Sequence, residues 1–135
     1  MKRLVLGLIL LLALIHAGVS EARSKAMSYD TQVIKAIIGE NDKDGFAGMY
    51  AVACAIRNRG TLKGVHGRYK KLRNVPDGTI MKAARAWHTS EYGRDVTNGA
   101  THWENVKAFG KPDWAKDMVV TARIGRHVFY KERKK

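Results

Sequence analysis

The sequence has one cysteine, Cys54, among its 135 residues. A single cysteine forms no internal disulfide, so the frameworks of disulfide-rich secreted domains are excluded. Cys54 lies in the stretch AVACAI, where its apolar neighbours predict a buried, inert thiol. A nucleophilic cysteine needs a polar, electropositive setting instead. The chain must therefore be held together by the packing of its helices.

Acidic residues are also scarce, because 12 Asp and Glu stand against 25 Lys and Arg and give a net charge of +13. Such a charge does not specify a fold, but it indicates an anionic partner. For a cytoplasmic chain that partner is usually nucleic acid, whereas an exported chain more often meets anionic lipid or cell-wall polymer. No nucleic-acid recognition motif is present, so we expect no nucleic-acid partner.

The beginning of the chain decides between these partners. Lys2 and Arg3 precede the apolar run Leu4–Ile15, which small residues follow. This order predicts a secretory signal peptide over residues 1–22 and a flexible leader over residues 23–28. A membrane span needs roughly 20 apolar residues, so an uncleaved anchor is the less favoured alternative. We expect export to the periplasm, the cell wall or the exterior, with only transient membrane contact through the signal segment.

The remaining residues, 29–135, are predicted to form one mainly helical domain of the α+β class. Apolar residues recur at helical spacing or form longer apolar segments. We expect helices at residues 30–38, 46–56, 79–91 and 113–122, with a long basic loop at residues 61–78. The turn signal at residues 97–99 and the alternating stretch IGRHVFY at residues 124–130 predict a small extended element near the C-terminus.

No metal or cofactor is expected. Oxygen-bearing side chains recur at Glu40, Asp42 and Asp44, as in a calcium loop, but the twelfth position counted from Glu40 is Ala51 and not the required glutamate. The dispersed histidines and the single cysteine supply no zinc ligand set. The sequence also lacks the motif that surrounds a catalytic serine in hydrolases.

Glu40 is the strongest candidate for chemistry. It stands alone between two apolar segments, directly after Gly39. A carboxyl group at a helix end beside apolar residues suits the general acid of glycoside cleavage. Taken alone, the residues leave a second interpretation open, in which Glu40 only caps a turn.

The stretch GENDKDGFAGMYAVACAIRNR, residues 39–59, resembles the signature of bacterial spore-cortex-lytic and cell wall hydrolases of the SleB type. That signature is a glutamate, three residues, an acid, three residues, a glycine, and then Ala-Val-Ala and Asn-Arg. The stretches TNGATHWEN and IGRHVFY are similar to elements of the family's second half. The resemblance extends over Val33–Tyr130.

The resemblance implies a lysozyme-like fold with a long groove for glycan strands. It implies cleavage of the peptidoglycan bond between N-acetylmuramic acid and N-acetylglucosamine, in characterised members by lytic transglycosylation. Glu40 takes the position of the catalytic acid. Asp44 stands where the family usually has Glu, and Lys43 where it often has Gly. Candidate substrate contacts are Asp44, Asn58, His102, Trp103, Glu104, Asn105, His127 and Tyr130.

Several of these assignments have structural alternatives. Asn58 and Asn105 would serve equally to tie loops together, and His127 would serve as a hydrogen-bonded structural histidine. Trp87 and Trp114 lie in segments with helical patterns and are expected in the core.

The reaction also has alternatives. Attack by water in place of the sugar's own hydroxyl would make the protein a muramidase, with Asp44 or Glu104 as the base. The alternative to an enzyme is a basic cell-wall-binding module, which would bind the wall without cleaving it. In either class we expect a monomer that acts on peptidoglycan strands.

Overall fold

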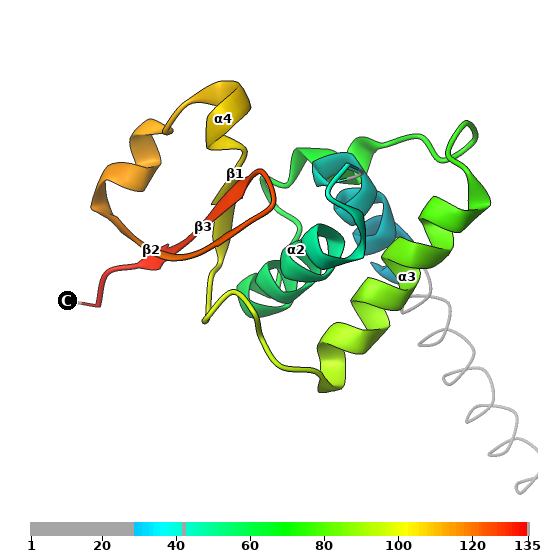
Figure 1. Cartoon of the computed structure of the whole chain (residues 1–135), viewed down its shortest axis with the longest axis horizontal. Coiled ribbons are helices and arrows are strands. Elements are labelled where there is room, and N and C mark those ends of the chain that lie inside the picture. The colour runs from blue at the N-terminus through cyan, green and yellow to red at the C-terminus, as the bar shows by residue number, and fades with distance from the viewer. Residues whose placement is uncertain (1–28, 42, 135) are drawn as a thin grey trace, which may run out of the picture. The chain divides into compact units, whose positions relative to one another are not determined.

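The computed structural model describes residues 29–41 and 43–134, and the expected signal peptide and leader lie outside the described residues. Residues 29–40 form a first helix. The elements that follow it (Figure 1) are α2 (Gly45–Arg59), η1 (His66–Tyr69), α3 (Asp77–Tyr92), β1 (His102–Glu104), α4 (Val106–Phe109), η2 (Asp113–Asp117), β2 (Met118–Ile124) and β3 (His127–Glu132). Within these described residues, no helix is long and apolar enough to cross a membrane.

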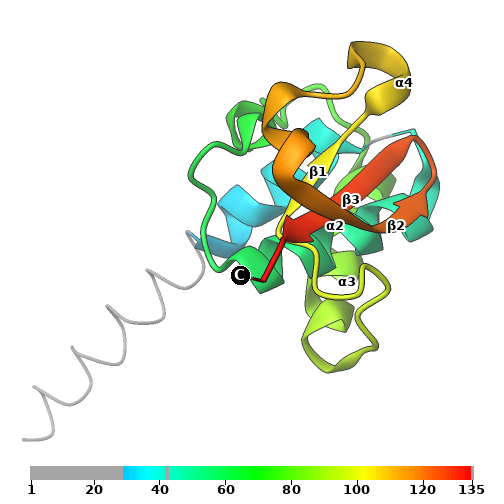
Figure 2. The same ribbon diagram turned by 90° about the vertical axis from the view of Figure 1, so that its left-hand side faces the viewer.

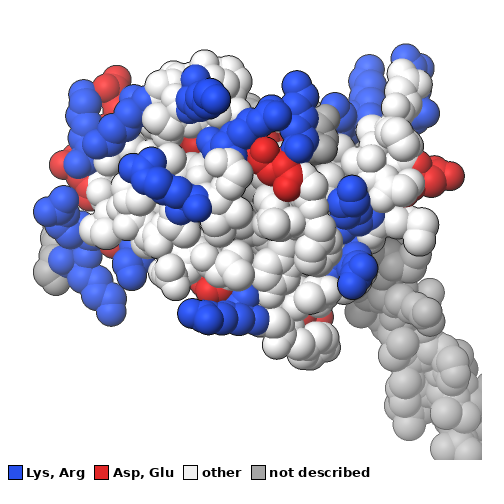
Figure 3. Space-filling view, in the orientation of Figure 1, with Lys and Arg blue, Asp and Glu red and all other residues white. Residues whose placement is uncertain are grey.

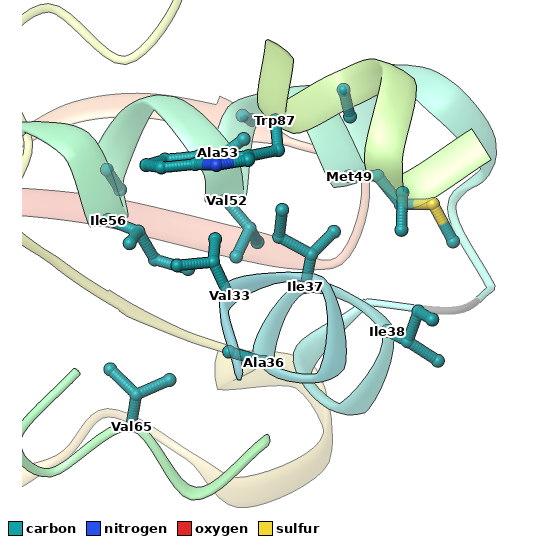
Figure 4. Packing of buried hydrophobic residues seen from close by; sticks show 14 of the residues in the cluster. Val33, Ala36, Ile37, Ile38, Met49, Val52, Ala53, Ile56, Val65 and Trp87 are labelled. Atoms are coloured by element: carbon teal, nitrogen blue, oxygen red, sulfur yellow. The ribbon is translucent and has the colours of Figure 1, made fainter. Parts of the chain in front are cut away.

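The helical part is built around α2, which is apolar almost all round, as the sequence predicts. Its residues Ala51–Ile56 are all buried. Val33 and Ile37 of the first helix and Trp87 of α3 belong to the same hydrophobic cluster (Figure 4). Complete burial of one large aliphatic side chain stabilises a fold by about 1.5–3 kcal/mol. This cluster therefore holds the helices together without a disulfide.

Arg57, a basic residue in the last turn of α2, connects this helix to α3. The Arg57 guanidinium lies 3.8 Å from the centre of the Trp87 ring and donates hydrogen bonds to the Trp87 carbonyl and the Ser90 hydroxyl. Gly60 then ends α2 with a φ of 71°, a conformation that glycine adopts without strain.

The C-terminal part is a three-stranded antiparallel sheet in the order β1-β3-β2 (Figure 2), so the last strand is the central one. Trp103 of β1 is opposite Phe129 of β3, and both belong to the main cluster. Successive side chains of a strand point to opposite faces. Accordingly, Val128 and Tyr130 form a second cluster with Ala115 of η2. The prediction of a mainly helical α+β domain with a small extended element near the C-terminus is confirmed.

Residues 113–122 differ from the prediction of one helix. Only Asp113–Asp117 are helical, as the short 3-10 turn η2, and Met118–Ile124 form strand β2. Val119 and Val120 are β-branched, which favours a strand, and their partners lie on β3. The helix start at Asp113 was predicted from local signals, whereas the strand depends on β3, which comes later in the sequence. Helix α4 was not predicted.

Candidate active site

Glu40 is the last residue of the first helix, and two distant segments hold its carboxyl group. Oε1 accepts a hydrogen bond from the Gly67 backbone N–H at 2.7 Å. Oε2 accepts one from the Trp103 indole N–H at 3.1 Å. These donors belong to η1 and β1, so the helical part and the sheet together fix the plane of the carboxyl group. A carboxylate has about four lone-pair positions, so acceptor capacity remains on both oxygens.

A close backbone approach brings Gly67 to Glu40. A Cβ added at Gly39 would lie 2.5 Å from the Gly67 Cα, and one added at Gly67 would collide with the Ala36 carbonyl oxygen. Only glycine at both positions lets η1 lie directly against the last turn of the first helix. Close packing therefore explains why glycine precedes Glu40 in the sequence. This packing also places the Gly67 backbone N–H where it donates to the Glu40 carboxyl group.

Three pockets meet at Glu40, which among the described residues is the single one that lines all three. The Trp114 pocket, about 440 Å³, is also lined by His66, His102, Trp103, Glu104 and Trp114. The Lys70 pocket, about 510 Å³, includes His66, Gly67, Lys70, Glu104 and Phe109. The Asn105 pocket, about 290 Å³, includes Asn41, Asn105, Phe109, Arg126 and His127. Glu40 thus lies where the hollows adjoin, with space to either side of it.

Trp114 was expected in the core, and this expectation is wrong. Its side chain is 43% exposed and lines the Trp114 pocket, because η2 carries it over the face of the sheet. The ring centres of His102 and Tyr130 lie 5.4 and 5.3 Å from that of Trp114. Tyr130 is only 2% exposed, so it supports Trp114 from within the second cluster and has little surface for a ligand. Trp87, by contrast, is buried as expected.

Phe109 was not predicted as a site residue. It is 79% exposed and lines both the Lys70 and Asn105 pockets, away from the Trp114 pocket. Asn105 caps the short helix α4 that carries it, because its Oδ1 accepts the Ala108 N–H at 3.1 Å. The pattern of an asparagine three residues before Ala108 is the local signal for this turn. Asn105 therefore has a structural role, although it also lines a pocket.

Two further carboxylates differ in their surroundings. Glu104 lines both the Trp114 and Lys70 pockets, and its Oε1 accepts the Asn105 N–H at 2.8 Å. The Asp44 side chain is 11% exposed and lines none of the three pockets described above. Its oxygens instead accept the Arg126 N–H at 2.9 Å and pair with the Arg126 Nε at 3.3 Å. Of the two, only Glu104 shares open space with Glu40.

The two histidines predicted as site residues both lie at pockets. His127 is buried beside Asn41, whose Nδ2 lies 3.5 Å from its Nδ1. Burial lowers the pKa of His127, although the carboxylates of Asp44, Glu40 and Glu104 oppose the shift. Burial and the nearby Arg59 guanidinium likewise lower the pKa of His102. Both imidazoles are therefore largely neutral at neutral pH.

Asn58 lies outside these pockets and ties two segments together. Its Nδ2 donates to Asp95 Oδ2 at 2.9 Å and to the Ala100 carbonyl at 3.1 Å. These contacts are those of a residue that ties loops together, which is the structural alternative predicted for Asn58 from the sequence. Among the described residues, no group of three His, Cys, Asp or Glu side chains is arranged to hold a metal ion.

No protein-family model and no curated protein matches the sequence. Two solved structures are similar to it. One is the catalytic domain of the germination-specific lytic transglycosylase SleB from Bacillus anthracis, with a TM-score of 0.57 and 26% identity over 76% of this chain and 93% of that one. The other is the catalytic domain of the SleB protein from Bacillus cereus, with a TM-score of 0.55 and 27% identity over 76% of this chain and 89% of that one.

The resemblance to SleB-type cell wall hydrolases is confirmed. It rests on both sequence and fold, since the identity exceeds a quarter of the aligned residues and nearly the whole of each SleB domain is covered. The α+β fold predicted from the sequence agrees with these neighbours.

Proposed function

We propose that this protein is a peptidoglycan-degrading glycosidase that cleaves the bond between N-acetylmuramic acid and N-acetylglucosamine. The observation that carries the proposal is the Glu40 carboxyl group, held by two N–H donors at the junction of three pockets. An oriented acid with space on both sides is what cleavage of a bond within a strand requires. The similarity to two SleB catalytic domains, one of them a lytic transglycosylase, supports the same function.

In the first step, Glu40 acts as the general acid. Its proton passes to the glycosidic oxygen while the bond from that oxygen to C1 of the muramic acid breaks, and the sugar gains oxocarbenium character. The Gly67 and Trp103 donors fix the carboxyl group during this transfer. Such orientation matters because proton transfer needs the acid within hydrogen-bond reach of its target.

In the second step, the Glu40 carboxylate acts as the base. It takes the proton of the sugar's own 6-hydroxyl group as that oxygen bonds to C1, which gives a 1,6-anhydro sugar and restores protonated Glu40. An attacker within the same molecule has an effective concentration as high as about 10⁵–10⁸ M, so no protein nucleophile is required. The reaction is then a lytic transglycosylation.

Hydrolysis is the second candidate reaction, and Glu104 is the observation that favours it. This carboxylate lines two of the pockets that Glu40 lines. Glu104 would take a proton from a water held between the two groups as the water oxygen bonds to C1, as the general base does in an inverting glycosidase. Asp44 is a weaker candidate for this base, because Arg126 occupies both of its oxygens.

The decisive experiment compares the wild type with Glu40→Gln and Glu104→Gln on purified peptidoglycan, with mass analysis of the products. Glutamine keeps the size of Glu40 but cannot transfer its proton, so we expect cleavage to fall by about 10²–10⁴-fold. Its amide nitrogen leaves one of the two N–H donors without an acceptor, so we expect a small decrease in the thermal unfolding temperature but no loss of the fold. Anhydro products indicate a transglycosylase, whereas reducing ends that are one water heavier indicate a muramidase. Near-normal clearing by Glu40→Gln would support the non-catalytic wall-binding module instead.

Export remains part of this proposal, because the substrate lies outside the cytoplasm. The basic surface (Figure 3) fits an anionic wall, and Lys and Arg side chains outnumber Asp and Glu in the view shown. N-terminal sequencing of secreted protein tests the predicted cleavage near residue 22. A monomeric state is likewise a prediction, for which analytical ultracentrifugation is the measurement.

A further inference from the structure

A fourth hollow, with basic residues in its lining, lies beside the Trp114 pocket. We call this hollow the basic pocket. It has a volume of about 300 Å³ and is lined by Arg59, Thr101, His102, Lys131 and Glu132. Arg59 and His102 also line the Trp114 pocket. The two hollows therefore adjoin, and a substrate bound over Trp114 can reach the basic pocket with a side branch.

Arg59 is held firmly between the two hollows. Its Nη1 donates to the Thr101 carbonyl at 3.3 Å and its Nη2 donates to the Lys63 carbonyl at 2.7 Å. A guanidinium has five N–H donors, so these two bonds leave three for a ligand. Because its partners are neutral carbonyl groups, the positive charge of Arg59 is not cancelled by them.

Lys131 adds a second positive charge from β3. In the part of the chain that the structure describes, neither Lys131 nor Arg59 takes part in an ion pair. Of the described residues that line this pocket, Glu132 is the one carboxylate, so two cationic side chains stand against one anionic side chain. His102 adds little positive charge at neutral pH, because burial and the Arg59 guanidinium lower its pKa. The basic pocket therefore carries a net positive charge beside the acidic centre formed by Glu40 and Glu104.

We propose that the basic pocket binds a carboxylate group of the substrate strand through Arg59 and Lys131. This inference deepens the proposed function and rests on it. Peptidoglycan offers carboxylates of two kinds near the scissile bond, at the ends of stem peptides and on lactyl groups that carry no peptide. Arginine presents its donors in a planar fork that matches a carboxylate, and lysine adds a mobile point charge. The site thereby favours strands that carry a free carboxylate at this position over neutral strands.

The test uses the full chain and three strand preparations. The first carries stem peptides with free carboxyl groups. The second has been treated with an amidase, so that only lactyl carboxylates remain. The third is the peptide-bearing strand with its carboxyl groups converted to neutral methylamides. The measured quantity is the ratio of kcat/KM on each charged strand to kcat/KM on the neutral one.

We expect the wild-type ratio to exceed one for at least one charged strand, by about three- to tenfold, which is less than a buried charged hydrogen bond gives because Lys131 is exposed and solvent screens its charge. A high ratio for the first strand assigns the site to the stem peptide, and one for the second assigns it to the lactyl group. Lys131→Gln should lower that ratio toward one. The control Lys82→Gln removes the same charge from an exposed position on α3 and should keep the wild-type ratio.

Equal kcat/KM on all three strands would overturn the proposal while leaving the glycosidase function intact, and so would an unchanged ratio in Lys131→Gln. If the wild type cleaves no strand, the proposed glycosidase function fails. A pull-down with the same three strands then tests carboxylate binding by the basic pocket on its own. Preferential retention of a charged strand by the wild type, lost in Lys131→Gln and kept in Lys82→Gln, would support it. Equal retention of all three strands would refute it.

Discussion

Asp44 and Arg126 are joined twice, although 82 residues separate them in the sequence. Asp44 precedes α2, and Arg126 lies in the turn between β2 and β3, so this pair anchors the hairpin to the helical part. A Cβ added at Gly125 would collide with the Asp44 carboxyl group, which means that the turn lies directly on it. His127 Nδ1 lies 3.7 Å from the same carboxyl group. Asp44 thus positions the strand that carries His127 into the Asn105 pocket.

Asp44→Asn should therefore act mainly on stability. The amide keeps an oxygen acceptor for the Arg126 N–H but loses the negative charge that pairs with Nε. A hydrogen bond to a charged group is worth about 1.5–3 kcal/mol, and the half-exposed Arg126 places this loss near the lower value. Urea unfolding measures it. The control Asp113→Asn breaks an exposed pair with Lys116 and should leave the midpoint unchanged. Equal midpoints for both variants would contradict the anchoring role.

Gly67→Ala should remove activity together with stability. The added methyl group would collide with the Ala36 carbonyl and lie 2.8 Å from the Glu40 backbone nitrogen. The η1 backbone must then move away, and its N–H loses Glu40 Oε1. We expect a lower thermal unfolding temperature and a large loss of cleavage.

The matched control for that variant is Gly78→Ala at the start of α3. An added Cβ meets nothing within 4 Å there. Alanine also has the higher helix propensity, so the unfolding temperature should hold or rise slightly. A Gly67→Ala protein with normal cleavage would show that the backbone donor is dispensable.

The fold could be predicted where a single segment carries its own pattern. α2 is apolar on all sides, and the stretch at β3 alternates, so both were expected from local sequence. β2 was missed because its formation depends on pairing with β3 and includes an irregularity between Val120 and Ala122. The local helix-start signals at Asp113 correspond in the structure only to the short 3-10 turn η2.

The site could be predicted in part. Glu40 was expected from its isolated position and from the family resemblance. Its partner Trp103 was named as a site residue, but the hydrogen bond between them spans 63 residues and no spacing rule predicts it. The exposure of Trp114 and Phe109 depends on how η2 and α4 lie against the sheet. Tertiary placement of this kind leaves no local signal in the sequence.

Asp95 makes stability depend on pH at acidic values. Burial alone would raise the pKa of this carboxyl group, but hydrogen bonds from Thr97, Asn58 and Gly99 outweigh burial and lower it. A carboxyl pKa that is lower in the folded state contributes stability above its unfolded value of about 3.9. That contribution is lost as the pH falls through the folded value.

Asp95→Asn should therefore destabilise the protein more at pH 7 than at pH 3. Thermal unfolding of both proteins across this range is the measurement. The difference between their unfolding temperatures should shrink as the pH falls below about 4. The exposed carboxylate Asp117 supplies the control variant Asp117→Asn. A constant difference from pH 7 to pH 3 would count against the hydrogen-bonded carboxylate as the source.

Trp103→Phe tests the second donor to Glu40. Phenylalanine retains an aromatic ring for the cluster with Phe129 but has no N–H for Glu40 Oε2. Losing a hydrogen bond to a charged group corresponds to a decrease in rate of roughly tenfold or more. We expect this loss in kcat rather than in KM, because the donor orients the acid and not the strand. Initial rates over a range of strand concentrations separate the two constants. A change in KM alone would make Trp103 a substrate contact instead.

Trp114 and Phe109 should bind the strand on opposite sides of Glu40. Each is an exposed aromatic residue, and the two share no pocket, whereas Glu40 shares a pocket with both. Covering a large side chain by a sugar face removes apolar area from water, so each alanine variant should raise KM by about five- to tenfold. Phe109→Ala should keep the wild-type unfolding temperature, whereas Trp114→Ala should lower it somewhat, because the Trp114 ring packs against His102 and Tyr130.

The double variant distinguishes one continuous strand site from two separate ones. If the strand lies across Glu40 and contacts both rings, the losses in kcat/KM should multiply on long strands. On a short fragment that reaches only one ring, one of the two substitutions should have no effect. Tyr92→Ala provides the control, because Tyr92 is also an exposed aromatic residue but lines none of the pockets around Glu40. A KM that rises as much in Tyr92→Ala as in the other two variants would mean that exposed aromatic residues bind the wall without regard to position. The hollows beside Glu40 would then not be the path of the strand.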